Sequence, residues 1–246
     1  MTTEIETYLN SLSEDISIID ISSKNIDYIP DLTRFKNLEK LYCHNNKLTS
    51  LPPLPQNLVE LSCCDNKLTS LSNLPEQLKE LYCFNNKLTS LPPLPQNLVE
   101  LLCSKNQLTS LPTLPQNLEI LYCPKNQLTS LPTLPQHLVD LYCSENQLTS
   151  LPTLPTQSLL ELYYDNNPIY EIINNNRMNQ INKNIKILNN FRYLYYCLQY
   201  KKQLRKWLWE KVREPNIMQK YHPKYLIENL GEDNDLDEVL NNWIYK

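Results

Sequence analysis

A period of twenty residues runs through the first two thirds of this 246-residue chain and restricts the folds open to it. The segment NKLTSLPPLPQNLVEL occurs unchanged at 46–61 and 86–101, and LTSLP begins at residues 48, 88, 108, 128 and 148. The aligned copies read L-x-x-L-x-C-x-x-N-x-L-T-S-L-P-x-L-P-x-x. Because one copy is too short to bury its own leucines, we expect successive copies to stack into a solenoid.

Eight copies of this pattern are predicted between residues 16 and 169. Six regular copies begin at residues 38, 58, 78, 98, 118 and 138, and a seventh begins at Leu159 after a one-residue insertion. An earlier, degenerate copy begins at Ile16 and has Lys24 in place of the asparagine, which is typical of a terminal repeat. We expect residues 1–15 to form an N-terminal cap segment and residues 170–246 to form a helical C-terminal region.

Each copy contains a predicted strand followed by a predicted extended return. In the x-L-x-C-x segment apolar and polar residues alternate, which indicates a strand with one face buried. Prolines such as Pro112 and Pro115 exclude a helix from the return and favour polyproline-like backbone. The strands of stacked copies are therefore expected to form one sheet of eight strands, about 35 Å long at a strand spacing of ~4.8 Å.

This pattern resembles the leucine-rich repeat family, whose L-x-x-L-x-L-x-x-N-x-L motif is met with cysteine in place of the third leucine. The period and the L-P-x-L-P linker resemble the short, bacterial-effector type. The resemblance covers residues 16–169 and implies an α/β-type leucine-rich repeat solenoid, with a parallel sheet on the concave face, an extended convex side and a helical C-terminal cap. Bacterial effectors of this type often append a ubiquitin ligase with a C-x-D cysteine, but Cys197 is followed by Leu198 and Gln199, so that activity is not carried over.

The whole chain also resembles the leucine-rich repeat proteins of giant amoeba-infecting viruses. The cysteine-for-leucine repeat, the bias towards Asn, Ile, Lys and Tyr, and the ending YHPKYLIENLGEDNDLDEVLNNW carry this second resemblance. It implies no assigned biochemical role.

Two columns of recurring residues are predicted to hold the scaffold. The asparagines stand where the chain leaves each strand, and their amides can pair turn backbone groups that burial would leave unpaired. The cysteines face the interior, where a buried thiol behaves as a small apolar group and needs no disulfide or metal. These structural residues are Asn46, Asn66, Asn86, Asn106, Asn126, Asn146, Asn167, Cys43, Cys63, Cys83, Cys103, Cys123 and Cys143.

The outward strand positions vary between copies and are the candidate binding surface. A row of acidic residues runs beside a row of tyrosines, which suit a protein interface because aromatic anchors dominate such contacts and acidic groups attract a basic partner. The alternative is that tyrosine only reflects strand propensity. The predicted partner-binding residues are Tyr42, Tyr82, Tyr122, Tyr142, Tyr163, Glu60, Glu80, Glu100, Asp140 and Phe84.

Two other functions remain as alternatives. His44 and Cys64 share one outward column in adjacent copies, so a cysteine enzyme or a zinc site at this pair is a weak alternative. Residues 177–224 hold 12 Lys and Arg against two Glu, and an aromatic basic helix there would suit a nucleic-acid or membrane-surface adaptor. The competing interpretation of that segment is a cap on the open end of the solenoid.

Charge and glycine content restrict function and location further. Residues 1–170 carry 10 Lys and Arg against 18 Asp and Glu, a net charge of −8, so a host protein with a basic surface is the expected partner. Gly231 is the only glycine, which excludes glycine-rich nucleotide loops, and we expect no cofactor, no metal and no catalysis. No signal peptide or membrane span is apparent, so an intracellular protein in the host cytoplasm is predicted, its oligomeric state left open.

Overall fold

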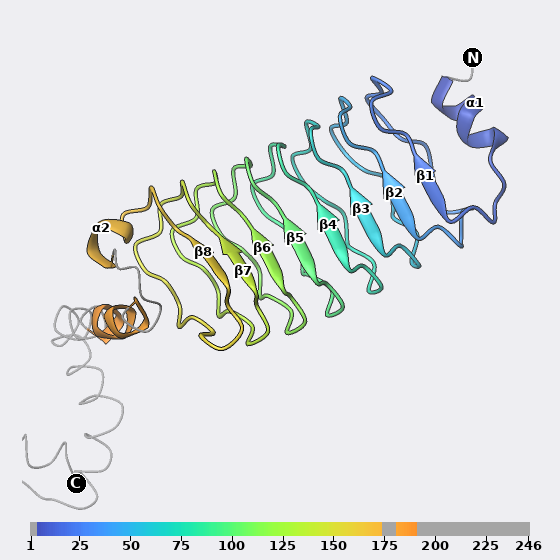
Figure 1. The fold of residues 1–246 in the computed structure, drawn as a ribbon. Coiled ribbons are helices and arrows are strands. Elements are labelled where there is room, and N and C mark those ends of the chain that lie inside the picture. Colours follow the sequence, from blue (N-terminus) through green and yellow to red (C-terminus); the bar gives the residue numbers. More distant parts are fainter. Residues whose placement is uncertain (1–3, 174–180, 191–246) are drawn as a thin grey trace, which may run out of the picture. The chain divides into compact units, whose positions relative to one another are not determined.

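The computed structural model describes residues 4–173 and 181–190 (Figure 1). The chain divides into two units, Met1–Asn189 and Asn190–Lys246, and the first of these contains the solenoid. No helix within the described residues is long and apolar enough to cross a membrane.

Eight short parallel strands form a single sheet in which spatial order follows sequence order (Figure 1). Each strand pairs with the next at the same repeat position, so that Leu41 lies opposite Leu61 and Leu61 opposite Leu81. This confirms the predicted leucine-rich repeat solenoid with its parallel sheet. The strands are β1 (Ile18–Asp20), β2 (Lys40–Tyr42), β3 (Glu60–Ser62), β4 (Glu80–Tyr82), β5 (Glu100–Leu102), β6 (Ile120–Tyr122), β7 (Asp140–Tyr142) and β8 (Glu161–Tyr163).

One continuous apolar core fills the solenoid behind the sheet. In the copy that begins at Leu98, the side chains of Leu98, Leu101, Cys103 and Leu108 are all fully buried, and the other regular copies repeat this arrangement. The proline-containing return is neither helix nor strand, and its leucines close the core from the convex side. Each copy thus buries its apolar set only against its neighbours, as stacking requires.

Helical segments cover both ends of this core. Near the N-terminus, α1 (Glu4–Ser11) buries Ile5 and Leu9 in the same apolar cluster as the repeats. At the other end, α2 (Tyr170–Ile173) and the helical residues 181–190 add Ile173, Ile181 and Ile185 to that cluster. The side chain of Asn182 also accepts a hydrogen bond from the amide of Leu154 at 3.0 Å and donates one to its carbonyl at 3.0 Å.

Ser72 interrupts the proline pattern of the return, and replacing it is expected to stabilise the protein. The regular copies carry proline at this position, and the Ser72 hydroxyl is the only buried side-chain oxygen or nitrogen of the described residues without a hydrogen-bond partner. Ser72→Pro should raise the free energy of unfolding by about 1 kcal/mol, because it removes the unpaired hydroxyl and restricts the unfolded chain. Urea unfolding checks this, and Ser72→Ala separates the two contributions; a less stable Ser72→Pro variant would contradict the expectation.

Candidate functional site

The asparagine column joins each turn to the preceding repeat. The side-chain nitrogen of Asn106 donates to the carbonyl oxygens of Cys103 at 3.1 Å and of Cys83, one repeat earlier, at 3.0 Å. Its side-chain oxygen accepts from the amide of Leu88, also in the preceding repeat, at 3.0 Å. The same bonds recur at the other asparagines from 66 to 167, and Asn46 makes the equivalent contacts to residues 21–26. The column therefore ties backbone groups of successive copies together.

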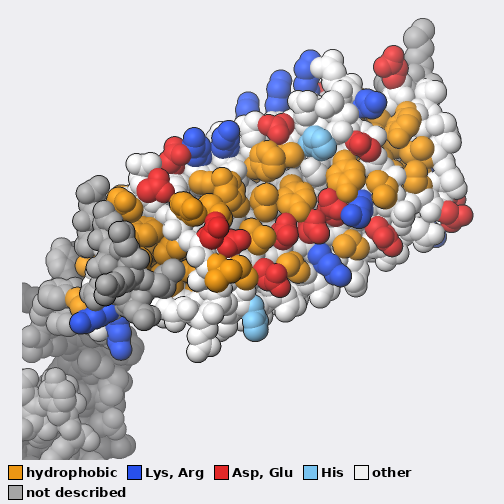
Figure 2. All heavy atoms as spheres, in the orientation of Figure 1, with side chains coloured by type: hydrophobic (Ala, Val, Ile, Leu, Met, Phe, Trp, Pro, Cys, Tyr) orange, Lys and Arg blue, Asp and Glu red, His pale blue; other side chains and the backbone are white. Residues whose placement is uncertain are grey.

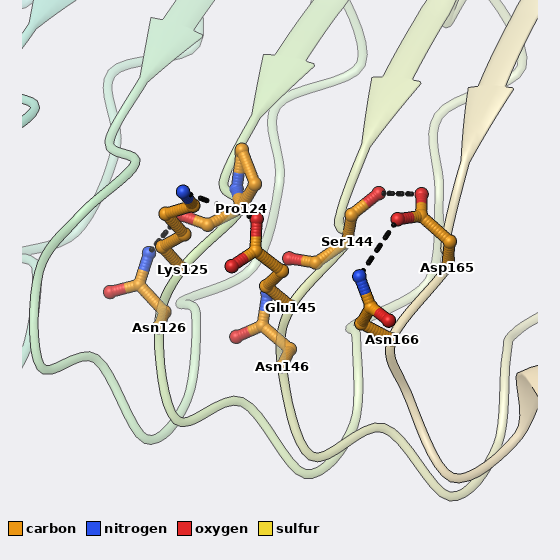
Figure 3. Close-up of polar contacts among 8 residues, drawn as sticks. All are labelled: Pro124, Lys125, Asn126, Ser144, Glu145, Asn146, Asp165 and Asn166. Atoms are coloured by element: carbon orange, nitrogen blue, oxygen red, sulfur yellow. Dashed lines mark hydrogen bonds and ion pairs between the residues drawn. The ribbon is translucent and has the colours of Figure 1, made fainter.

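A left-handed turn residue stands immediately before each asparagine, which sequence reasoning missed. Lys105, Lys125 and Glu145 have φ of 51°, 57° and 52°, a region that costs an L-residue other than glycine, Asn or Asp about 1–2 kcal/mol. Figure 3 shows Lys125 and Glu145 beside Asn126 and Asn146, with the Lys125 ammonium 3.3 Å from the Glu145 carboxylate. These turns are made without glycine, and the asparagine that follows each of them holds the backbone in place.

The cysteine column lies wholly inside the core. All six side chains are 0% exposed, and every cysteine of the described residues is a free thiol. Burial raises the pKa of each of these thiols, to about 12 for Cys103 and Cys143, because the thiolate would have no solvation there. These thiols are therefore protonated at neutral pH and pack in the core as small apolar groups.

The concave sheet face carries the rows of acidic residues and tyrosines. Figure 2 shows acidic and hydrophobic side chains intermingled across the strands, with a row of Lys and Arg along the upper edge and a few basic side chains among the acidic ones. Most members are partly buried, and Tyr163 on β8 is the most open of the tyrosines, at 50% exposure. The first outward row reads Lys40, Glu60, Glu80, Glu100, Ile120, Asp140 and Glu161, and the second reads Tyr42, Ser62, Tyr82, Leu102, Tyr122, Tyr142 and Tyr163.

Tyrosine hydroxyls of the N-terminal half point at the acidic row. Lys40 on β2 pairs with the carboxylate of Glu60 at 2.8 Å, and the hydroxyl of Tyr42 donates to the same oxygen at 3.1 Å. The hydroxyl of Tyr82 lies 2.7 Å from Glu80 and 2.9 Å from Glu100. Desolvation and these two carboxylates raise the pKa of Tyr82, so the hydroxyl stays protonated and serves as a donor.

The C-terminal half is more aromatic. The rings of Tyr142 and Tyr163 stack with centroids 4.7 Å apart, and Tyr122 lies 4.9 Å from Tyr142 on the other side. The Tyr142 hydroxyl donates to Glu161, which raises the pKa of Tyr142 to about 12. Desolvation, and then the adjacent charge of Glu161, raise the pKa of Asp140. This half therefore offers a broad aromatic surface beside two closely spaced carboxyl groups.

A hollow of about 400 Å³ lies beside these tyrosines. Two of its lining residues bond to each other, since the hydroxyl of Ser144 donates to the carboxylate of Asp165, and the side-chain amide of Asn166 donates to that carboxylate at 3.2 Å (Figure 3). The structure thus adds Glu161 and Asp165 to the candidate face. Both stand in the outward columns of the aligned copies once the one-residue insertion before Leu159 is allowed for. The lining residues are Ser104, Lys105, Tyr122, Pro124, Lys125, Tyr142, Ser144, Glu145, Tyr163 and Asp165.

Cys64 stands in the same outward column as His44 and outside the core cluster, but the structure does not bring the two side chains into contact. Cys64 is only 6% exposed, and Ser62 lies between the two groups, with its hydroxyl oxygen 3.3 Å from His44 Nδ1 and 3.6 Å from Cys64 Sγ. Burial raises the pKa of the Cys64 thiol, whereas a nucleophile or a zinc ligand needs the thiolate. Among residues 4–173 and 181–190 no three His, Cys, Asp or Glu side chains are grouped to hold a metal ion.

Phe84 lies partly exposed in the third outward column, two residues beyond Tyr82. The basic segment predicted over residues 177–224 lies almost entirely outside the described residues, as do the acidic tail and the aromatic residues of that segment.

Two kinds of comparison connect the chain to known proteins. A family model described as two copies of leucine-rich repeats matches residues 56–96, and a model of a single leucine-rich repeat matches residues 37–58. No curated protein sequence matches the chain.

Solved structures show the same architecture. YopM from Yersinia enterocolitica WA-314 is 34% identical over 64% of this chain with a TM-score of 0.53, and the chain spans 39% of YopM's length. The leucine-rich repeat domain of a Shigella effector is 31% identical over 66% of this chain and 73% of that domain, with a TM-score of 0.56. A functional domain of InlJ from Listeria monocytogenes, described as including a cysteine ladder, is 29% identical over 62% of this chain and 35% of its own length, with a TM-score of 0.56.

Proposed function

The chain belongs to the leucine-rich repeat family, and on that premise we propose that it is a non-catalytic module whose concave sheet face binds a partner protein. The observation that supports this most is the combination of ordered tyrosines with carboxylates that form no ion pair with the described residues. Within the described residues Lys40 neutralises Glu60, but no Lys or Arg pairs with Glu80, Glu100 or Asp140. A face of this kind attracts a basic partner and offers it aromatic contact area.

The order of the face favours binding over a purely structural role for the tyrosines. Strand propensity accounts for a tyrosine on a sheet, but not for hydroxyls that reach the carboxylates of the next strand, as Tyr42 reaches Glu60 and Tyr82 reaches Glu100. Side chains held in this way lose little further conformational entropy when a partner docks. The face is therefore prepared for recognition before the partner arrives.

We further propose that the partner is a host protein with a basic surface and that binding takes place inside the host cell. The similarity to YopM and to the leucine-rich repeat domain of a Shigella effector supports a host partner. The net charge of −8 over residues 1–170 supports the basic surface.

Affinity capture with a triple variant tests the proposal. Tyr82→Ser/Tyr122→Ser/Tyr142→Ser should reduce recovery of the partner by about tenfold or more, because these aromatic anchors supply the contact area. The matched control is Tyr8→Ser/Tyr28→Ser, which removes two tyrosines that are 40% and 39% exposed and lie outside the outward rows of the sheet. Equal recovery with the triple variant and with the control would remove the concave face from consideration.

A further inference from the structure

We propose that the concave face takes an extended arginine-containing segment with the pattern basic-x-apolar-x-basic, laid across the strands. The inference rests on the proposed function and specifies what the partner presents. Two pairs of carboxylates carry it. The first pair is Glu80 on β4 and Glu100 on β5, and the second is Asp140 on β7 and Glu161 on β8.

Each pair calls for a cation that the described residues do not supply. The single hydroxyl proton of Tyr82 cannot be donated to Glu80 and Glu100 at once, although both carboxylates lie within 2.9 Å of its oxygen. Asp140 and Glu161 lie directly opposite each other in the parallel register, where like charges repel. Lys40 shows what relieves such a site, since its ammonium lies 2.8 Å from Glu60 in the same row.

The side chain that fits these sites best is arginine. Its planar guanidinium presents several N–H groups, which can bond two carboxylates at once, and it stacks on aromatic rings. Each carboxylate pair has an aromatic ring beside it. Tyr82 lies at the first pair, and the stacked rings of Tyr142 and Tyr163 lie at the second. A lysine would supply the charge but neither the fork nor the stacking surface.

The spacing of the two pairs sets the spacing of the basic residues. The midpoint between β4 and β5 is three strand intervals from the midpoint between β7 and β8, about 14 Å at ~4.8 Å for each interval. An extended chain rises ~3.3 Å per residue, so four residues span about 13 Å. In such a chain residues i, i+2 and i+4 point to the same side. The residue at i+2 then faces β6, where Ile120 interrupts the acidic row with an apolar side chain.

Two labelled peptides of identical composition test this register by fluorescence anisotropy. SRTVTRS places its arginines four residues apart with valine between them, whereas SRTVRTS places them three apart, so that one arginine points away from the face. With the full chain at physiological ionic strength, SRTVTRS should bind about tenfold more tightly than SRTVRTS. Glu80→Gln/Glu100→Gln, and separately Asp140→Asn/Glu161→Gln, should each weaken SRTVTRS by about tenfold and abolish the preference.

A charge-matched variant serves as the control. Glu76→Gln/Glu119→Gln also removes two negative charges, but both side chains are exposed and lie outside the outward rows, so we expect a change below about threefold. Equal affinity for the two peptides, or no binding of either at about 1 mM, would overturn the inference. Should the peptides fail in this way while the triple tyrosine variant still loses its partner, the proposed function stands and only the proposed arginine spacing is wrong. If the triple tyrosine variant also recovers its partner as the wild type does, the proposed function and the proposed spacing are both wrong.

Discussion

Replacing Asn106 by alanine should lower the free energy of unfolding by about 3–5 kcal/mol. The variant leaves the buried amide of Leu88 without its acceptor and removes the donor shared by the carbonyls of Cys83 and Cys103. An unpaired buried donor costs about 1–3 kcal/mol, and the lost bonds add to it. The two carbonyls keep the bonds that the neighbouring asparagines donate, which limits the loss.

Asn97→Ala is the matched control for this experiment. Asn97 also donates its amide to the preceding repeat, to the carbonyl of Glu76 at 2.9 Å, but it does so on the exposed surface. Water replaces that bond, so the loss should stay below about 1 kcal/mol. Urea unfolding of the two variants beside the wild type gives the comparison, and equal stability of Asn106→Ala and Asn97→Ala would refute the role given to the column.

Raising the pH from 8 to 10 should remove about 8 kcal/mol from the free energy of unfolding. The six core cysteines have an ordinary pKa of 9.0 when exposed, and burial raises it, to about 12 for Cys103 and Cys143. Above pH 9 the unfolded chain therefore releases protons that the folded chain keeps, so stability falls as the pH rises. Each thiol contributes about 1.4 kcal/mol by pH 10, and the loss continues up to about pH 12.

Stability measurements at pH 8, 9 and 10, with a reductant present, test this expectation. The pH dependence between 9 and 10 should correspond to about three to five protons released on unfolding. Cys103→Ala/Cys123→Ala should reduce that number by about a third, even though the variant is less stable at every pH. Release of one proton or fewer by the wild type would show that the thiols are not held in a dry core.

Most of the fold could be predicted from the repeat, because every copy must bury the same set of apolar side chains against its neighbours. The positions of leucine and cysteine in one copy predict a buried strand face, and the constant period predicts that Leu101 lies opposite Leu121 across the sheet, as it does. The number of strands and their parallel order follow from the same period. Helical residues 181–190 were predicted only in outline, because their contacts to Leu154 and Leu151 come from a segment outside the repeat.

Two features of the candidate site lay beyond sequence reasoning. The left-handed turn residues stand one position before each column asparagine, but Lys105 and Glu145 are not residue types that favour this conformation, so residue type alone does not identify them. Cys64 is a short side chain in a column that also holds His44 and Phe84, and it is buried where longer side chains stay partly exposed. The alternating pattern predicts on which face of the sheet a side chain lies. The size of the surrounding side chains then determines its exposed fraction.

The most direct test of the concave face is photo-crosslinking from a single position. A photoreactive phenylalanine analogue replaces Tyr142 on the sheet face in one variant and Gln116, exposed on the return, in another. The proposed function predicts that position 142 becomes covalently linked to the partner, that position 116 does not, and that the crosslink disappears at high ionic strength. Crosslinking from position 116 with none from position 142 would contradict it.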